Sequence, residues 1–198
     1  GESIGIIGAL KIKGVPFLLT GFFAYCAVEA TAMYWASTYL VEVKGITVDR
    51  AAQFASLFYI GLTIGRFLGG FIMNKLGDRR MILLGTCILS CGVISLMLPT
   101  GNQLVSLIGF IIIGFGCAPV YPCIIHSTPD NFGAEYSGAI IGIQMASAYV
   151  GSTFMPPLFG LGAELISVRI YPFYLMVFVC LMIIMTERAG KIHADKPD

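Results

Sequence analysis

Residues 104–126 read LVSLIGFIIIGFGCAPVYPCIIH and contain no Asp, Glu, Lys or Arg. An α-helix needs about 20 predominantly apolar residues to cross the hydrocarbon core of a bilayer. A segment of this length and composition is therefore typical of a transmembrane helix. It suggests that the chain is a membrane protein.

The overall composition agrees with this interpretation. Of the 198 residues, 57% are hydrophobic and 12% are charged, and the mean hydropathy is +0.87. Soluble domains carry about twice that share of charged residues. The formal net charge is only +1, and without a large basic patch we expect no nucleic-acid partner. The composition therefore favours a polytopic protein whose surroundings are the lipid bilayer.

Six apolar stretches, separated by short polar or Gly/Pro-containing connections, predict an all-α fold with six transmembrane helices. Each has roughly 18 to 26 residues, enough to cross a bilayer. They are residues 16–41, 51–73, 81–98, 104–126, 135–160 and 170–187. We accordingly expect the end of a linker at 1–13, a six-helix bundle at 14–188 and a tail at 189–198.

The basic residues predict the orientation of these helices. Six crossings place both ends of the chain on one side, and most Lys and Arg lie on that side, with Arg66 just inside it. The positive-inside rule then places both termini and the connection 74–80 in the cytoplasm of a multi-pass cell-membrane protein. Because the first residue is Gly1 rather than Met, we expect residues 1–13 to arrive from a longer protein.

Small residues recur at every fourth position in the second and fifth apolar stretches. This spacing lets helix backbones approach closely, although it is common in membrane helices generally. The two stretches occupy corresponding places in two sets of three helices, as in a 3+3 inverted repeat. The glycines concerned are Gly61, Gly65 and Gly69 in one stretch, and Gly138 and Gly142 in the other.

Glu29 lies near the middle of the first apolar stretch. An acid at that depth costs about 2.5 kcal/mol or more unless it is neutral, paired or hydrated. We interpret it as a carboxyl group that binds a ligand, a cation or a proton at the wall of a water-filled passage. A structural hydrogen bond between helices is the alternative.

Aromatic residues lie close to Glu29 along the same predicted helix. Tyr25 shares its helical face, and Tyr34 and Trp35 follow one to two turns later. Their rings are suited to stacking against a sugar or another small organic solute. Interfacial anchoring or simple packing is the alternative role for Tyr34 and Trp35.

Two further candidates lie in the second half of the chain. Tyr121 stands between Pro119 and Pro122, which interrupt the helical hydrogen bonds and can expose carbonyl groups to a cavity. Gln144 lies near the middle of the fifth stretch, and its amide can donate and accept hydrogen bonds. A packing kink and an interhelical hydrogen bond are the respective alternatives.

The sequence contains none of the common motifs for hydrolytic enzymes, phosphate binding or metal binding. It contains no HExxH, no GxSxG, no phosphate-binding Walker A loop and no CxxC pair, and only two histidines. We therefore expect no catalytic residues, no cofactor and no metal site.

Residues 65–80 read GRFLGGFIMNKLGDRR and resemble the signature loop of major facilitator superfamily transporters. That pattern is a Gly, an acid or amide, a base, a second Gly and further basic residues. The family often has Asp where this chain has an amide, so an ionic latch to a neighbouring helix end would be weaker here. The matching residues are Gly70, Asn74, Lys75, Gly77, Arg79 and Arg80.

Residues 25–31, 120–122 and 151–160 further resemble the fucose and glucose/galactose symporter branch of that family. The resemblance implies that the chain is the second half of a twelve-helix transporter whose N-terminal six-helix half is missing. It also implies proton-coupled alternating access for a small solute such as a sugar, with coupling acids carried by the first half.

In such a transporter the first and fourth apolar stretches would line the cavity. The second and fifth would face the other half, with their glycines at the seam. Two alternatives stay open: an exporter of drug-like or other organic solutes, and a six-helix membrane scaffold that transports nothing.

Overall fold

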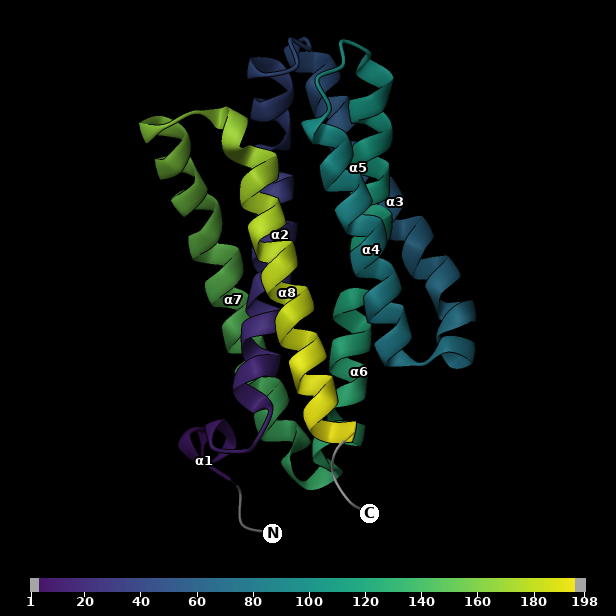
Figure 1. Cartoon of the computed structure of the whole chain (residues 1–198), viewed down its shortest axis with the longest axis vertical. Helices are drawn as coiled ribbons and strands as arrows, with labels where there is room; N and C mark the ends of the chain where they lie inside the picture. The colour runs from purple at the N-terminus through teal and green to yellow at the C-terminus, as the bar shows by residue number, and fades with distance from the viewer. Residues whose placement is uncertain (1–3, 195–198) are drawn as a thin grey trace.

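A computed structural model describes residues 4–194, and within that range every regular element is a helix. The long helices lie roughly side by side along one axis, as Figure 1 shows. In chain order the elements are α1 (Ile6–Leu10), α2 (Val15–Glu42), α3 (Val48–Leu76), α4 (Asp78–Met97), α5 (Gln103–Cys117), α6 (Val120–Phe132), α7 (Ala134–Leu165), the 3₁₀ turn η1 (Val168–Ile170) and α8 (Tyr171–Ala194).

Five helical segments in the described part of the chain are long and apolar enough to cross a membrane. They are Val15–Glu42, Val48–Leu76, Asp78–Met97, Gln103–Phe132 and Val168–His193. The 32 residues of α7 are not among them, because many of its residues are small or polar. This helix nevertheless runs beside α2 in the bundle. The helical class is confirmed, and the six-helix 3+3 arrangement stays a prediction.

The fourth apolar stretch forms two helices rather than one. Helix α5 ends at Cys117 and α6 begins at Val120, so the break falls at Ala118 and Pro119. A proline lacks the N–H that the preceding turn needs and its ring clashes with that turn. The structure thus places the interruption at the first of the two prolines that the sequence singled out.

Helix α2 is the central element, and 61% of its most apolar window is buried within the chain. It packs against both α7 and α8. Buried tyrosine hydroxyls bond to backbone carbonyls where α2 meets its neighbours. The Tyr171 hydroxyl of α8 donates to Ala32 O of α2 at 2.7 Å, and the Tyr39 hydroxyl of α2 donates to Leu96 O of α4 at 2.9 Å. Such bonds satisfy hydroxyl groups that have no water around them.

Two of the predicted packing glycines hold α3 against α5. A Cβ atom at Gly61 would collide with the backbone carbonyl of Ile111, and one at Gly65 would lie 2.5 Å from the Ala118 Cβ. The family resemblance had implied a seam with another half at these positions, and the structure places a helix of the same chain there. Gly138 and Gly142, in contrast, have no atom within 4 Å of an added Cβ and face open space.

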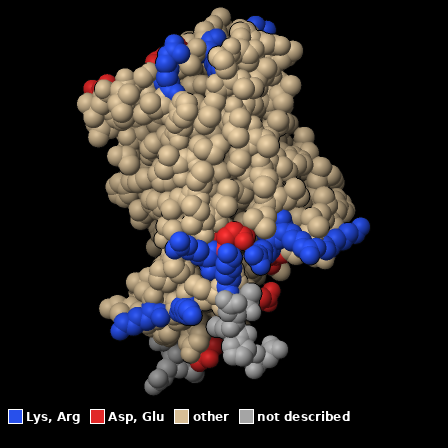
Figure 2. All heavy atoms as spheres, viewed as in Figure 1, with Lys and Arg blue, Asp and Glu red and all other residues tan. Residues whose placement is uncertain are grey.

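Much of the surface of the described residues is apolar. Figure 2 shows a wide band without charged atoms across the middle of one face, with Lys and Arg gathered toward the end that carries both termini. Large apolar side chains are exposed along α3 and α7, including Phe67 and Phe71 on α3 and Phe154 and Leu165 on α7.

The ends of the predicted bundle differ in detail from the structure. The segment expected to be a linker contains α1, whose Ala9 is buried. Helix α8 continues to Ala194, beyond the end predicted at residue 188. Residues 1–3 and 195–198 of the predicted linker and tail lie outside the described range.

Candidate functional site

Glu29 lines a cavity of about 450 Å³. The residue is partly buried, and its helix α2 meets α3, α6 and α7 around the cavity. A pocket of this volume is large enough for a small organic ligand. The lining residues are Cys26, Glu29, Ala30, Met33, Tyr34, Arg66, Tyr121, Met145, Ala148, Tyr149 and Ser152.

Tyr25 lies behind this wall rather than on it. The residue is fully buried, and its hydroxyl donates a hydrogen bond to Cys117 O at 3.2 Å. The same hydroxyl interacts with the Glu29 carboxylate. Tyr25 therefore ties α2 to the break between α5 and α6 from a position beside Glu29, and it is not among the residues that line the cavity.

Tyr121 is on the cavity wall, as the sequence predicted. It follows the helix break, its ring packs on Phe22 with centroids 5.1 Å apart, and its hydroxyl contacts the Met145 sulfur at 3.3 Å. Sulfur is a weak acceptor. The hydrogen bond from the Tyr121 hydroxyl to this sulfur is therefore weak, and another acceptor can replace it.

Tyr34 and Trp35 line a second, adjoining cavity of about 650 Å³ between α2 and α7. Tyr34 and Ser152 belong to both cavities. The indole N–H of Trp35 donates to Pro156 O at 2.9 Å, at the double proline of α7. Trp35 is thus a packing anchor as well as a wall residue, and the two cavities are neighbours along α2.

Gln144 is placed away from these cavities. The residue is fully buried, and its Oε1 lies 3.1 Å from the Thr128 hydroxyl, which has the Ile124 carbonyl as a second acceptor at 3.0 Å. Its Nε2 has no partner among the described residues. The structure therefore places this predicted substrate-binding residue between α6 and α7, where it makes an interhelical contact.

Arg66 is the functional candidate that the sequence argument passed over. It was counted with the cytoplasmic basic residues, yet the structure places it on the wall of the Glu29 cavity. It stands inside the apolar stretch 51–73. Since an ionisable residue in such a stretch was the criterion that singled out Glu29, the same signal would have found Arg66.

The loop motif lies at the end of the bundle that carries both termini (Figure 1). Gly77 alone connects α3 to α4 and has φ of +79°, a conformation that glycine adopts readily. Gly70 has open space around it, and three further motif residues are exposed, namely Asn74, Lys75 and Arg80.

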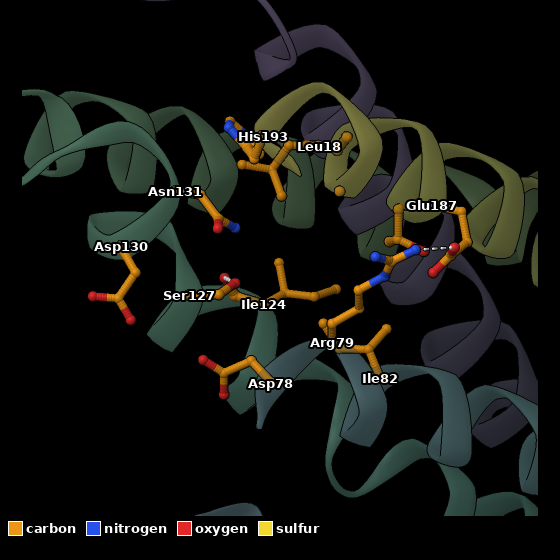
Figure 3. Close-up of a pocket in the computed structure, with 13 residues that line it drawn as sticks. Leu18, Asp78, Arg79, Ile82, Ile124, Ser127, Asp130, Asn131, Glu187 and His193 are labelled. Carbon is orange, nitrogen blue, oxygen red and sulfur yellow. Dashed lines mark hydrogen bonds and ion pairs between the residues drawn. The ribbon is translucent and has the colours of Figure 1, made fainter. Parts of the chain in front are cut away.

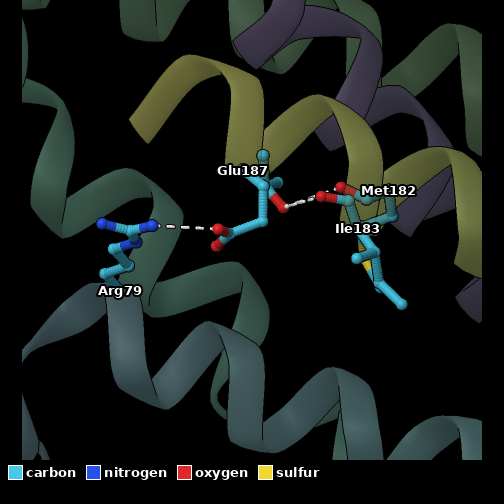
Figure 4. Close-up of polar contacts among 5 residues, drawn as sticks. Arg79, Met182, Ile183 and Glu187 are labelled. Atoms are coloured by element: carbon cyan, nitrogen blue, oxygen red, sulfur yellow. Dashed lines mark hydrogen bonds and ion pairs between the residues drawn. The ribbon is translucent and has the colours of Figure 1, made fainter. Parts of the chain in front are cut away.

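The other motif residue, Arg79, borders a cavity of about 390 Å³ at this end. Figure 3 shows Arg79 and Asp78 entering from α4, with Ser127 and Asp130 opposite them on α6. The Arg79 guanidinium donates to Glu187 of α8 at 2.9 Å, the contact drawn in Figure 4. This ion pair joins the start of α4 to α8.

A second polar contact joins α4 to α6 beside that cavity. The Asp78 carboxylate lies 2.8 Å from Nδ1 of His126. With Asp130, these residues offer three potential ligand atoms that all lie within 4.8 Å of one another. The sequence predicted no metal site, and this cluster is the arrangement in the described range that comes nearest to one.

Comparisons with known proteins agree with one another on the family. The family profile described as Major Facilitator Superfamily matches residues 17–189. A probable nitrate/nitrite antiporter from Thermus thermophilus is 31% identical over 70% of this chain and 34% of its own length. A putative glucose/galactose transporter from Helicobacter pylori is 24% identical over 78% of this chain and 37% of its own.

The fold has a counterpart among solved structures. The transporter FucP in its outward conformation matches with a TM-score of 0.79 and 16% identity, covering 92% of this chain and 45% of FucP. The chain therefore spans less than half the length of each of these proteins.

Proposed function

Because this chain belongs to the major facilitator superfamily, we propose that it forms the C-terminal half of a membrane transporter that moves a small polar solute by alternating access. Relatives more than twice its matched length support a partner half. So do the apolar faces left exposed on α3 and α7. Sugars are the solute class that we favour, with protons as the coupling ion, both termini in the cytoplasm, and Glu29 in the substrate chamber.

The observation that carries this proposal is the position of Glu29. Glu29 lies on a cavity wall to which four helices contribute, near the middle of the helix that is the most buried of the five candidate spans. Transporters of this kind place their binding sites near the bilayer midplane and open them to either side in turn. A scaffold protein would have no need to keep an acid at such a position.

The test uses the longer protein, with this chain and its partner half, reconstituted in vesicles. Uptake of radiolabelled sugars is measured with and without an inward proton gradient. We expect gradient-driven accumulation in the wild type and at least a tenfold slower rate in Glu29→Gln, because the variant cannot carry a proton at that site.

Glu42→Gln provides the matched control, because Glu42 is exposed at the far end of the same helix. It should transport as the wild type does. Wild-type accumulation in Glu29→Gln would remove Glu29 from the mechanism. Accumulation of no solute by the wild type would favour the scaffold alternative, and outward movement of organic cations would favour an exporter.

A further inference from the structure

Arg66 and Glu29 bring opposite charges to one cavity from different helices. Glu29 belongs to α2 and Arg66 to α3, and the remaining lining residues are uncharged side chains. Within the described range, neither is joined to another residue by an ion pair of 4.0 Å or less. The guanidinium group is therefore open to a ligand in the cavity.

We propose that this cavity binds a hydroxylated carboxylic acid of monosaccharide size, with Arg66 holding its carboxylate and a proton on Glu29 accompanying it. The inference rests on the proposed function, because it names the substrate class of the same cavity. A guanidinium group presents a planar fork of N–H donors that matches the two oxygens of a carboxylate. Of the groups on this wall, only Arg66 selects for a negative charge.

Glu29 decides the net charge that such an anion meets. Its titratable neighbours are Tyr25 and Cys26 on α2, Cys117 at the end of α5, and Tyr121 on α6. Phenol and thiol groups are neutral near pH 7. Tyr149 of α7 is a further phenol on the wall, and α8 contributes no lining residue.

The charge balance then couples the two ligands. An ionised Glu29 offsets the positive charge of Arg66, and a protonated Glu29 leaves that charge uncompensated in a site of low dielectric constant. The anion consequently binds better when the proton is present. By linkage, the proton also binds better when the anion is present.

The rest of the wall suits a hydroxylated ring. Several of the lining residues carry hydroxyl groups, and within the described residues the hydroxyl of Tyr121 bonds to the Met145 sulfur. A ligand hydroxyl can replace so weak an acceptor at little cost. The hydroxyl-bearing residues are Tyr34, Tyr121, Tyr149 and Ser152, and the apolar ones include Met33 and Met145.

Three probes of similar shape separate charge from size. Binding of D-glucuronate, D-glucuronamide and D-glucose to the purified longer protein is measured calorimetrically at about pH 7, where glucuronate is ionised. We expect glucuronate to bind at least about tenfold more tightly than glucuronamide.

Substitutions at Arg66 and Glu29 test their separate roles in binding the anion and in setting the charge of the cavity. Arg66→Gln should weaken glucuronate binding at least about tenfold and leave glucuronamide unchanged. Glu29→Gln should bind glucuronate at least as tightly as the wild type does, because the negative charge that offsets Arg66 is gone. Arg50→Gln is the control, because Arg50 is exposed on α3 and donates to Gln103 at 3.1 Å, away from the cavity.

The outcomes distinguish a failure of the proposed anion site from a failure of the proposed transport function. Tight glucose binding that Arg66→Gln does not alter, with no preference for glucuronate, would overturn the anion site and leave sugar transport standing. Binding of none of the probes would overturn both. If Arg66→Gln does not fold, the comparison of glucuronate with glucuronamide in the wild type still decides the question.

Discussion

The hydroxyl of Tyr25 donates a hydrogen bond of 3.2 Å to the backbone carbonyl of Cys117, which lies 92 residues away in the sequence. Cys117 is the last residue of α5, so this bond ties the central helix to the interruption before α6. Two prolines remove N–H donors from that region. The Tyr25 hydroxyl thus supplies a hydrogen-bond donor from α2 to a region in which two backbone N–H donors are missing.

Replacing Tyr25 by Phe tests how much this bond contributes. The variant keeps the ring and leaves a buried carbonyl without its donor, so we expect the free energy of unfolding to fall by about 1–3 kcal/mol. Chemical unfolding of the longer protein in detergent measures the change. Tyr34→Phe is the control because Tyr34 is 74% exposed. Equal stability of Tyr25→Phe and the wild type would show that the bond is dispensable.

Gly61 tests the close contact between α3 and α5. An added methyl group there would collide with the Ile111 carbonyl, which belongs to the backbone and cannot rotate away. We expect Gly61→Ala to lower the free energy of unfolding by about 1–3 kcal/mol.

Gly69 provides a control on the same helix and the same four-residue spacing. A Cβ at Gly69 would lie 3.7 Å from the Met81 Cε, which is an ordinary contact. Because alanine favours helix more than glycine, Gly69→Ala should be neutral or slightly stabilising. A similar loss of stability in both variants would contradict the assignment of Gly61 to the helix contact.

The sequence predicted the helical class because few backbone structures can satisfy all of their hydrogen bonds within lipid. Apolar stretches of sufficient length must satisfy their own backbone, and this requirement depends on composition alone. The same reasoning placed the break of the fourth stretch at the prolines. It could not set helix ends, because α7 and α8 continue past their apolar segments to Leu165 and Ala194.

The site was predicted in part for a similar reason. Glu29 and Tyr121 could be singled out as candidates because an acid or a proline-flanked tyrosine in an apolar stretch is visible in the sequence of one helix, and both line the cavity. The presence of Arg66 on the same cavity wall as Glu29, and of Gln144 beside Thr128, depends on how the helices are rotated about their axes against one another. That rotation is fixed by packing between distant segments, which periodicity in one segment does not reveal.

Gln144 provides a prediction that separates packing from substrate binding. Its Nε2 is buried and unpaired within the described residues, while its Oε1 accepts from Thr128. Gln144→Met should therefore change stability by less than about 1 kcal/mol, because both polar atoms leave together. Thr128→Val should cost about 1–3 kcal/mol, because it leaves the Gln144 oxygen without its donor.

The same Gln144→Met variant has a second readout in substrate affinity. Since Gln144 does not line the Glu29 cavity, we expect the affinity for the transported solute to stay within about twofold of the wild type. Titration of the solute into both proteins measures it. A loss of about tenfold or more would return Gln144 to the binding site, as the sequence first suggested.

The ion pair between Arg79 and Glu187 offers a test at the opposite end of the bundle. Its side chains are 56% and 28% exposed, so water and salt screen the attraction. A double-mutant cycle with Arg79→Gln and Glu187→Gln should give a coupling energy of at most about 1 kcal/mol. That coupling should diminish further at about 1 M salt, where the screening length is only a few ångströms.

Arg80→Gln is the matched control for this cycle, because Arg80 is an exposed neighbour in the same motif and forms no ion pair with a described residue. It should show no coupling to Glu187→Gln. A measured coupling of about 3 kcal/mol or more between Arg79 and Glu187 would mean that the pair is shielded from solvent in the longer protein. The contact between α4 and α8 would then act as a closure of the cytoplasmic end rather than as a screened surface bridge.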